Sequence, residues 1–282
     1  MDKTKVELFQ KNKDFLVCVD SDGCAMNTME VKHRKSFGPE MIKEWGLQER
    51  EEEILELWNH LNLYADTRGI NRFKGLALLF QKLAERGIEI PGREELKEWS
   101  DHTPQLSNDA LKKQLDKTGS EIFKKTYRWS LAVNESIAAL PIDEGAPFAN
   151  VKETLQLISQ KANVSIVSSA NGQAIDKEWS HFGLTPFVDV MLGQEAGTKS
   201  ICIEKLCAKG FQKDHALMVG DALGDLQAAR DNGVMFYPII AGEEGASWEK
   251  LQKEAFPKFL DGSYAGAYEK SLEDAFRARL SK

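Results

Sequence analysis

The stretch FLVCVDSDGC, residues 15–24, joins a short apolar run to a group of acidic and small residues. Residues 15–19 are apolar on both faces and include β-branched valines, which is typical of a buried parallel strand. The run ends abruptly at Asp-Ser-Asp-Gly, residues 20–23. The stretch therefore predicts a core strand that carries polar side chains at its carboxyl end.

The spacing of Asp20 and Asp22 can aim both carboxylates toward one site, and Gly23 lets the backbone turn sharply beside a ligand. One carboxylate can attack phosphorus while the other exchanges a proton with the leaving oxygen and later with water. A plain turn is an alternative, because Asp-Gly is a common turn pair. A calcium loop is excluded, because Cys24 and Val31 occupy positions that need oxygen ligands.

Further apolar runs follow in the second half of the chain, and helical patterns separate them. Strands alternating with helices favour an α/β fold with a parallel, doubly wound sheet. In such sheets, ligands bind beyond the carboxyl ends of the strands. The predicted strands lie within residues 163–169, 187–192, 215–221 and 234–240.

The region from residue 24 to residue 144 lacks strand-like runs and shows apolar residues at helical spacing. Three helical stretches are predicted within residues 51–61, 72–86 and 109–140, with loops rich in Pro, Gly and Ser between them. We therefore expect two domains. Residues 1–23 and 145–282 form the α/β core, and residues 24–144 form an all-helical cap.

Several polar residues of the second half lie at strand or helix ends. A hydroxyl at Ser168 or Ser169 can hold a phosphate oxygen, and the ammonium of Lys199 can offset carboxylate and phosphate charge. Asp221 can share a Mg²⁺ ion with the aspartate that ends the first strand, and Asp225 lies one helical turn later. Each position also has an ordinary interpretation, as a strand-terminal serine, a surface lysine or a helix N-terminal acid.

Taken in order, these parts resemble the signature of the haloacid dehalogenase superfamily, in its phosphoglycolate-phosphatase-like and phosphomutase-like group. That signature is a strand with Asp-x-Asp-Gly, a strand ending in Ser or Thr, a Lys, and a strand with Gly-Asp-x-x-x-Asp. The segment HFGLTPFVDVMLGQEAGTK, residues 181–199, also looks like the family's connection between the second and third parts. The resemblance covers residues 15–24 and 145–240, and it covers the helical insertion only in type and position.

The resemblance implies an aspartyl-phosphate on Asp20, with Asp22 as general acid/base. It implies a Mg²⁺ cofactor held by Asp20, the Asp22 backbone carbonyl and Asp221, with Asp225 in support. Ser168 and Lys199 would act on the transferring phosphoryl group. The full set of implied phosphate-binding residues is Gly23, Ser168, Ser169 and Lys199.

An Asp at position 22 suits phosphate ester chemistry, because the leaving alkoxide needs a proton. The predicted function is therefore hydrolysis of a small phosphorylated metabolite. A phosphomutase with the same residues stays an alternative, as does a catalytically idle binding module. Family phosphatases usually carry Thr where this sequence has Cys24, and since a thiol is the weaker donor, we expect an altered rate or redox sensitivity.

Three basic residues of the insertion, Arg68, Arg72 and Lys74, cluster beside Gly69 at a predicted helix start. They can meet an anionic group of the substrate if the cap closes over the site. The ordinary interpretation is a solvated basic face of a helix. The prediction is that one of them contributes to substrate choice.

The overall composition limits the partners of the protein. The formal net charge is -7, which lacks the basic footprint of nucleic-acid binding. The first residues carry charges without an apolar signal region, and no apolar run approaches a membrane span. The four cysteines form no CxxC pair. We expect a cytoplasmic enzyme that binds neither nucleic acid nor membranes, and the oligomeric state stays open.

Overall fold

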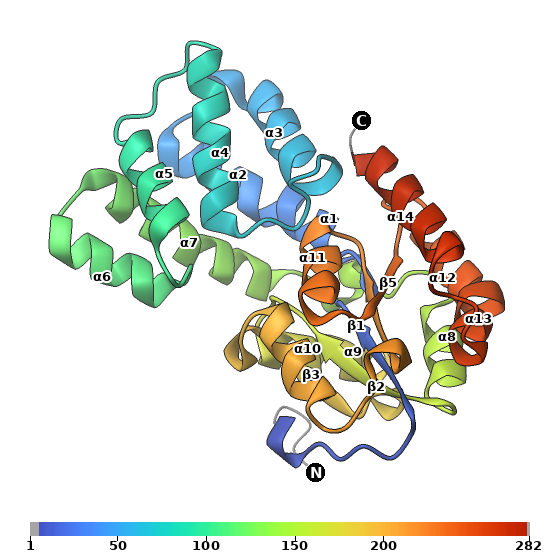
Figure 1. The fold of residues 1–282 in the computed structure, drawn as a ribbon. Coiled ribbons are helices and arrows are strands. Elements are labelled where there is room, and N and C mark those ends of the chain that lie inside the picture. Colours follow the sequence, from blue (N-terminus) through green and yellow to red (C-terminus); the bar gives the residue numbers. More distant parts are fainter. Residues whose placement is uncertain (1–5, 281–282) are drawn as a thin grey trace. The chain divides into compact units, whose positions relative to one another are not determined.

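The computed structural model describes residues 6–280 and contains a five-stranded parallel sheet with the strand order β3-β2-β1-β4-β5 (Figure 1). The first strand of the chain therefore lies in the middle, between β2 and β4. This confirms the predicted α/β fold with a parallel, doubly wound sheet. The strands are β1 (Phe15–Val19), β2 (Ala162–Val167), β3 (Val190–Leu192), β4 (Ala216–Gly220) and β5 (Met235–Pro238).

Strand β3 is shorter than the strand predicted over residues 187–192. The backbone N–H of Asp189 still donates to the Val164 carbonyl, at 2.9 Å. Its carboxylate then accepts from Val164 N at 2.9 Å and from Asn163 Nδ2 at 3.0 Å. A side chain therefore replaces the regular strand pairing at this point.

The chain divides into two compact units, of which unit 1 runs to Met29 and resumes at Ile142. Unit 2 comprises Glu30–Pro141. Unit 1 contains the sheet and the helices α8 (Val151–Ile158), α9 (Gly172–His181), α10 (Lys199–Cys207), α11 (Leu223–Asn232), α12 (Glu244–Lys250), α13 (Phe256–Asp261) and α14 (Ala267–Leu280).

The first division lies a few residues beyond the position predicted after residue 23. Met26 explains the difference, because it forms β-bridges with both Asp22 and Pro147 and so belongs to unit 1. The backbone N–H of Phe148 also donates to the Ala25 carbonyl, at 3.0 Å. The residues after the Asp-Ser-Asp-Gly turn are thus part of the sheet unit.

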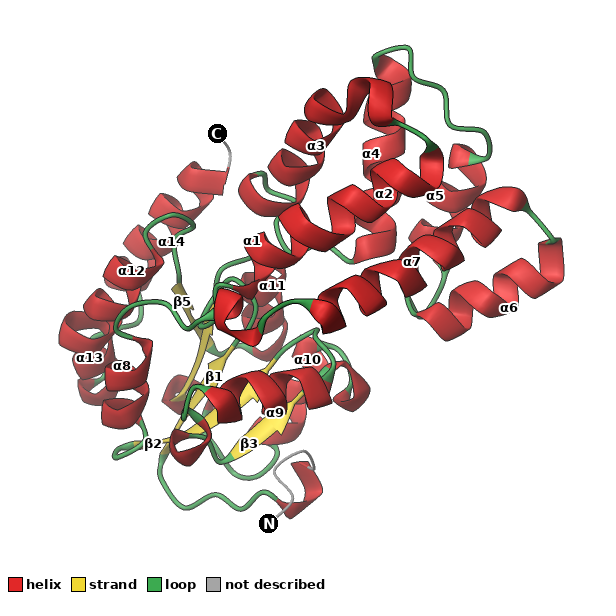
Figure 2. Ribbon diagram, turned by 180° about the vertical axis from the view of Figure 1, so that it is seen from behind, coloured by secondary structure: helices red, strands yellow, loops and turns green. Residues whose placement is uncertain are grey.

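Alternate residues of the central strand face opposite sides of the sheet, as the period of a strand requires. Val17 and Val19 pack in the apolar cluster that includes α8 and α9, whereas Leu16 and Cys18 pack in the cluster that includes α10 and α11. Figure 2 shows helices on both sides of the yellow strands. The sheet is a buried middle layer, and the exceptions among its mostly apolar side chains include Asn163 and Ser165 inside β2.

Unit 2 is helical over all of its described residues that have regular structure. Its own apolar cluster includes the predicted stripe of α4, formed by Phe73, Leu76, Leu79, Phe80 and Leu83. Short π-helical turns follow two of its helices. The helices are α1 (Thr28–Lys32), which begins in unit 1, α2 (Gly38–Trp45), α3 (Glu51–Asn59), α4 (Arg72–Glu85), α5 (Arg93–His102), α6 (Asn108–Thr118) and α7 (Glu121–Ala139).

The single helical stretch predicted over residues 109–140 is in fact two helices. Helix α6 ends at Thr118. The next residue, Gly119, has a left-handed φ of 64°, and its N–H donates to the Leu115 carbonyl at 2.8 Å. Glycine adopts this conformation at little cost, so it commonly ends helices.

Among the described helices of the whole chain, none combines the length and apolar character that a bilayer span requires.

Candidate active site

The loop of residues 20–26, called the aspartate loop below, folds over its own backbone at the end of β1. The Ser21 carbonyl accepts the amides of Cys24, Ala25 and Met26 at 3.3, 3.0 and 2.9 Å. Gly23 has a φ of 80°, a backbone angle that residues with a Cβ atom rarely adopt. The loop therefore holds its two carboxylates on a compact turn rather than on a mobile extension.

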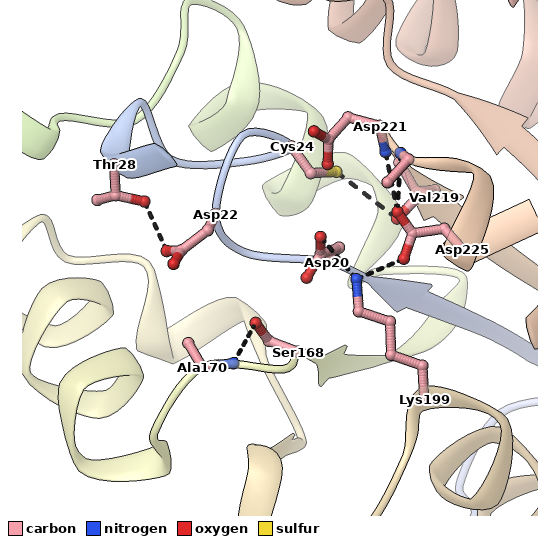
Figure 3. A network of polar contacts seen from close by, with 11 residues as sticks. Asp20, Asp22, Cys24, Thr28, Ser168, Ala170, Lys199, Val219, Asp221 and Asp225 are labelled. Atoms are coloured by element: carbon pink, nitrogen blue, oxygen red, sulfur yellow. Dashed lines mark hydrogen bonds and ion pairs between the residues drawn. The ribbon is translucent and has the colours of Figure 1, made fainter. Parts of the chain in front are cut away.

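Asp20 lies at the base of this loop and is almost fully buried, with 4% of its surface exposed. Its N–H donates to the Val219 carbonyl of β4 at 3.0 Å, which continues the strand pairing by one residue. Lys199, the first residue of α10, places its Nζ 2.8 Å from Asp20 Oδ2 and 2.5 Å from Asp225 Oδ1 (Figure 3). The ammonium thus lies between two buried carboxylates.

Asp225 is held on both of its oxygens. Its Oδ2 accepts from the backbone N–H groups of Asp221 and Ala222 at 3.1 and 3.0 Å, while Oδ1 contacts Lys199. One carboxylate oxygen from each of Asp20, Asp221 and Asp225 lies within 4.8 Å of the others. Three buried carboxylates therefore lie together, while Lys199 pairs with only two of them, and this excess of negative charge suits a divalent cation.

Burial changes the ionisation of this cluster. Burial raises the pKa of Asp20 to about 8, although the Lys199 charge acts in the opposite direction. Burial alone would lower the pKa of Lys199, but the charges of Asp20 and Asp225 outweigh it and raise that pKa above its ordinary value. Lys199 therefore stays protonated, and a cation bound beside Asp20 would favour its ionised form.

Asp22 has different surroundings. It is half-buried, and its Oδ1 accepts a hydrogen bond from Thr28 Oγ1 at 2.6 Å (Figure 3). Thr28 itself is 4% exposed. The sequence did not single out Thr28, because nothing in a threonine six residues after Asp22 signals that its side chain folds back to that carboxylate.

The two serines that end β2 also differ. Ser168 is buried, and its Oγ accepts from the Ala170 backbone N–H at 3.3 Å, while its own N–H donates to the Leu192 carbonyl at 3.0 Å. Ser169 is exposed. Since β1, β2 and β4 are parallel neighbours, Ser168, Asp20 and Asp221 leave the same edge of the sheet.

Cys24 is fully buried, and its Sγ donates to the Val219 carbonyl at 3.6 Å. Burial raises the pKa of this thiol well above its ordinary value, and the nearby Asp221 and Asp20 charges add to the effect. A buried neutral thiol reacts slowly. The thiol thus keeps a hydrogen bond to β4, and its surroundings oppose the redox sensitivity expected from the sequence.

The basic residues predicted to select substrate lie in unit 2. Arg68 is buried, and its Nη1 donates to the Leu63 carbonyl at 2.5 Å. Arg72 donates to Asn134 Oδ1 at 2.8 Å and lies 4.9 Å from the centre of the Phe37 ring. Lys74 is half-buried. The two guanidinium groups therefore contribute to the internal packing of the helical unit, and a role of these residues in substrate choice stays a prediction.

Comparison with known families identifies the chain. A family model described as haloacid dehalogenase-like hydrolase matches residues 66–239, more than half of the 282 residues. The chain belongs to this family. In this haloacid dehalogenase-like hydrolase, the region that the family model matches begins after the aspartate loop. It includes Ser168, Lys199, Asp221 and Asp225. The family and the hydrolase class predicted from the sequence are thereby confirmed.

Solved structures share the fold at low sequence identity. A predicted phosphoglycolate phosphatase from Haemophilus somnus 129pt is 17% identical, covers 82% of this chain and 88% of its own, and gives a TM-score of 0.50. A second structure, described by prediction as a phosphoglycolate phosphatase from Lactobacillus delbrueckii subsp. bulgaricus, is 15% identical, covers 94% of this chain and 98% of its own, and also gives a TM-score of 0.50. A search among curated proteins finds no match. The likeness therefore supports the fold.

Proposed function

We propose that this hydrolase is a magnesium-dependent phosphatase that acts on a small phosphorylated metabolite through an aspartyl-phosphate on Asp20. The supporting observation is the position of Asp20, a buried carboxylate at the end of the central strand with Lys199 Nζ at 2.8 Å. Family membership supports the same chemistry, and two proteins of similar fold are described as phosphoglycolate phosphatases by prediction.

In the proposed reaction, an Asp20 oxygen attacks phosphorus while Asp22 donates a proton to the leaving oxygen of the ester. Asp22 then accepts a proton from water as that water attacks the aspartyl-phosphate, which releases inorganic phosphate and regenerates Asp20. Lys199 and the Ser168 hydroxyl bind the phosphoryl oxygens. The backbone of Gly23 and Ser169 extends this phosphate site.

The residues present fit a Mg²⁺ ion, which prefers oxygen ligands and keeps several waters. Asp20, Asp221 and the Asp22 backbone carbonyl would hold it, because Asp225 already accepts bonds on both carboxylate oxygens. When bound, the ion offsets negative charge on the phosphoryl group and on the carboxylate cluster. Asp225 then orients Lys199 and the backbone that follows β4.

Replacement of Asp20 tests this proposal. Asp20→Asn should reduce phosphate release from p-nitrophenyl phosphate with Mg²⁺ by about 10⁴-fold or more, because an amide is a poor nucleophile. The matched control is Asp214→Asn, an exposed aspartate that precedes β4 at the opposite end from Asp221. Both variants should retain the circular dichroism spectrum of the wild type. Near-normal turnover by folded Asp20→Asn protein would exclude the mechanism.

A further inference from the structure

The C-terminal helices, which lie beyond the family match at residue 239, reach the aspartate loop. Trp248 of α12 is fully buried, and its Nε1 donates to the Cys24 carbonyl at 2.9 Å. An indole N–H can only donate, and leaving it or a carbonyl unpaired in the core is costly. The bond therefore favours one position of the loop relative to α12.

The remaining bonds of the loop explain why this contact matters. The amides of Cys24, Ala25 and Met26 all donate to the Ser21 carbonyl, which ties the loop to itself. Two side-chain bonds also tie it to other parts of the chain, from Trp179 Nε1 of α9 to Ser21 Oγ at 2.9 Å and from Cys24 Sγ to the Val219 carbonyl. The bond from Trp248 adds a contact from the C-terminal helices, and it ends on the carbonyl of the residue directly after the Asp-Ser-Asp-Gly turn. It thus contributes to holding the turn and its two carboxylates in place.

Helix α12 is itself held in place, so Trp248 is a firm donor. The Trp248 carbonyl accepts from Thr154 Oγ1 of α8 at 3.3 Å. The neighbouring Ser247 carbonyl accepts from Tyr237 Oη of β5 at 2.6 Å. Trp248 also packs in the same apolar cluster as Cys24. The indole therefore connects the loop to a helix that is fixed on a strand and on a second helix.

We propose that Trp248 is a positioning residue that sets the height of the aspartate loop above the sheet, so that the C-terminal helices take part in catalysis. This inference rests on the proposed function for its effect on turnover. Trp248 reaches the loop through the Cys24 carbonyl and touches neither Asp20 nor Asp22 in a hydrogen bond. A misplacement of about 1 Å in a reacting group can cost roughly 100-fold in rate.

Trp248→Phe tests the proposal, because it removes the donor and keeps an aromatic ring. We expect kcat to fall about 10- to 100-fold while KM for p-nitrophenyl phosphate stays nearly unchanged. The matched control is Tyr264→Phe, which removes another buried bond of the same C-terminal segment, from Tyr264 Oη to the Phe236 carbonyl at 2.6 Å. Its kcat should stay near that of the wild type.

Hydrogen-deuterium exchange gives a second measurement that does not need turnover. Amides of residues 24–26 should exchange faster in Trp248→Phe than in the wild type, and at the wild-type rate in Tyr264→Phe. Equal loss of kcat in the two variants would overturn the proposal, and so would unchanged loop exchange in Trp248→Phe. If the wild type releases no phosphate, the proposed function fails, whereas the exchange measurement still decides whether Trp248 positions the loop.

Thr154→Val serves if Trp248→Phe does not fold. This variant removes only the bond to the Trp248 carbonyl and nearly preserves the shape of the side chain. We expect the same kcat-specific loss in smaller degree, with faster exchange of residues 24–26. Wild-type kcat together with wild-type exchange in folded Thr154→Val would overturn the proposal.

Discussion

Asp20 and Asp22 leave the same loop, yet their carboxylates lie in different surroundings. Asp20 is nearly inaccessible and contacts Lys199, whereas Asp22 is half-buried and accepts from Thr28 Oγ1. A group that exchanges protons with both the substrate and water must be reachable from both. The surroundings of Asp22 therefore fit its proposed role in proton transfer, and the Lys199 contact of Asp20 fits its proposed place beside the phosphoryl group.

Substitution of Asp22 should show a dependence on the leaving group. In Asp22→Asn, kcat/KM for an alkyl phosphate should fall by about 10²–10⁴-fold, because its alkoxide needs a proton. The fall for p-nitrophenyl phosphate should be much smaller, because p-nitrophenolate leaves without one. Initial rates over a range of concentrations of the two substrates give the comparison.

The parameter kcat/KM isolates phosphoryl transfer to Asp20 from the later hydrolysis, in which Asp22 also acts. Thr28→Val is a useful companion variant, since it removes the hydrogen bond to Asp22 Oδ1 and leaves the carboxylate in place. Equal losses for both substrates in Asp22→Asn would contradict the role of proton donor.

Residues whose roles depend on a distant partner were beyond prediction from the sequence. Trp248 is far from Cys24 in the chain, and its bond exists only because α12 packs beside the loop. Arg72 resembled a free basic residue, but it contacts Asn134 and Phe37 from other helices of unit 2. By contrast, the position of Asp20 could be predicted, because a buried parallel strand that stops at a charged residue places that residue at the carboxyl edge of the sheet.

Among the strands and helices, the local sequence pattern was enough to predict an element whose own residues show a clear apolar spacing. Strand β1 has the bounds predicted from its apolar run, and the stripe of α4 is buried as its spacing indicated. Patterns failed where a tertiary contact decided the outcome, as at Asp189, whose side chain shortens β3. The break between α6 and α7 was missed although Gly119 marked it.

The junction of β4 and α11 allows a sharp test of packing at the site. A Cβ added at Gly220 would lie 2.3 Å from Asp225 Cβ, which is closer than real atoms approach. Gly220→Ala should therefore displace the Asp225 carboxylate from Lys199 and lower the free energy of unfolding by about 1–3 kcal/mol. We expect turnover to fall well beyond the loss caused by the unfolded fraction. Urea denaturation and phosphatase assays measure the two effects.

Gly224→Ala is the matched control, because nothing lies within 4 Å of a Cβ added at that position in α11. Alanine in a helix is favoured over glycine by roughly 0.5–1 kcal/mol. This variant should be as stable as the wild type or more so, with little change in turnover. Similar behaviour of the two variants would show that crowding against Asp225 is not the cause.

At the scale of the whole molecule, each unit has its own apolar core. The clusters around the sheet belong to unit 1, and the cluster that contains α4 belongs to unit 2. Units with separate cores can unfold separately. The proposed metal ligands all lie in unit 1, so a bound ion should stabilise that unit selectively.

Magnesium should therefore raise the midpoint of one calorimetric transition and leave the other unchanged. At about 100 times its dissociation constant, a ligand adds about 2.7 kcal/mol, which for a unit of this size corresponds to roughly 5–10 °C. Chelation with EDTA should reverse the shift and abolish turnover. Asp221→Asn should lose most of the shift. A midpoint unaffected by Mg²⁺, or an equal shift in Asp221→Asn, would contradict the proposed site.

The shift should also grow with pH. The pKa of Asp20 without metal is raised from 3.8 to about 8, so between these values the folded protein holds a proton that the unfolded chain releases. Stability of the metal-free protein therefore falls as pH rises through this window. Because Mg²⁺ must displace that proton, its stabilising effect should be larger at pH 8 than at pH 6. A shift that stays constant or shrinks over this range would show that Asp20 is ionised before the metal binds.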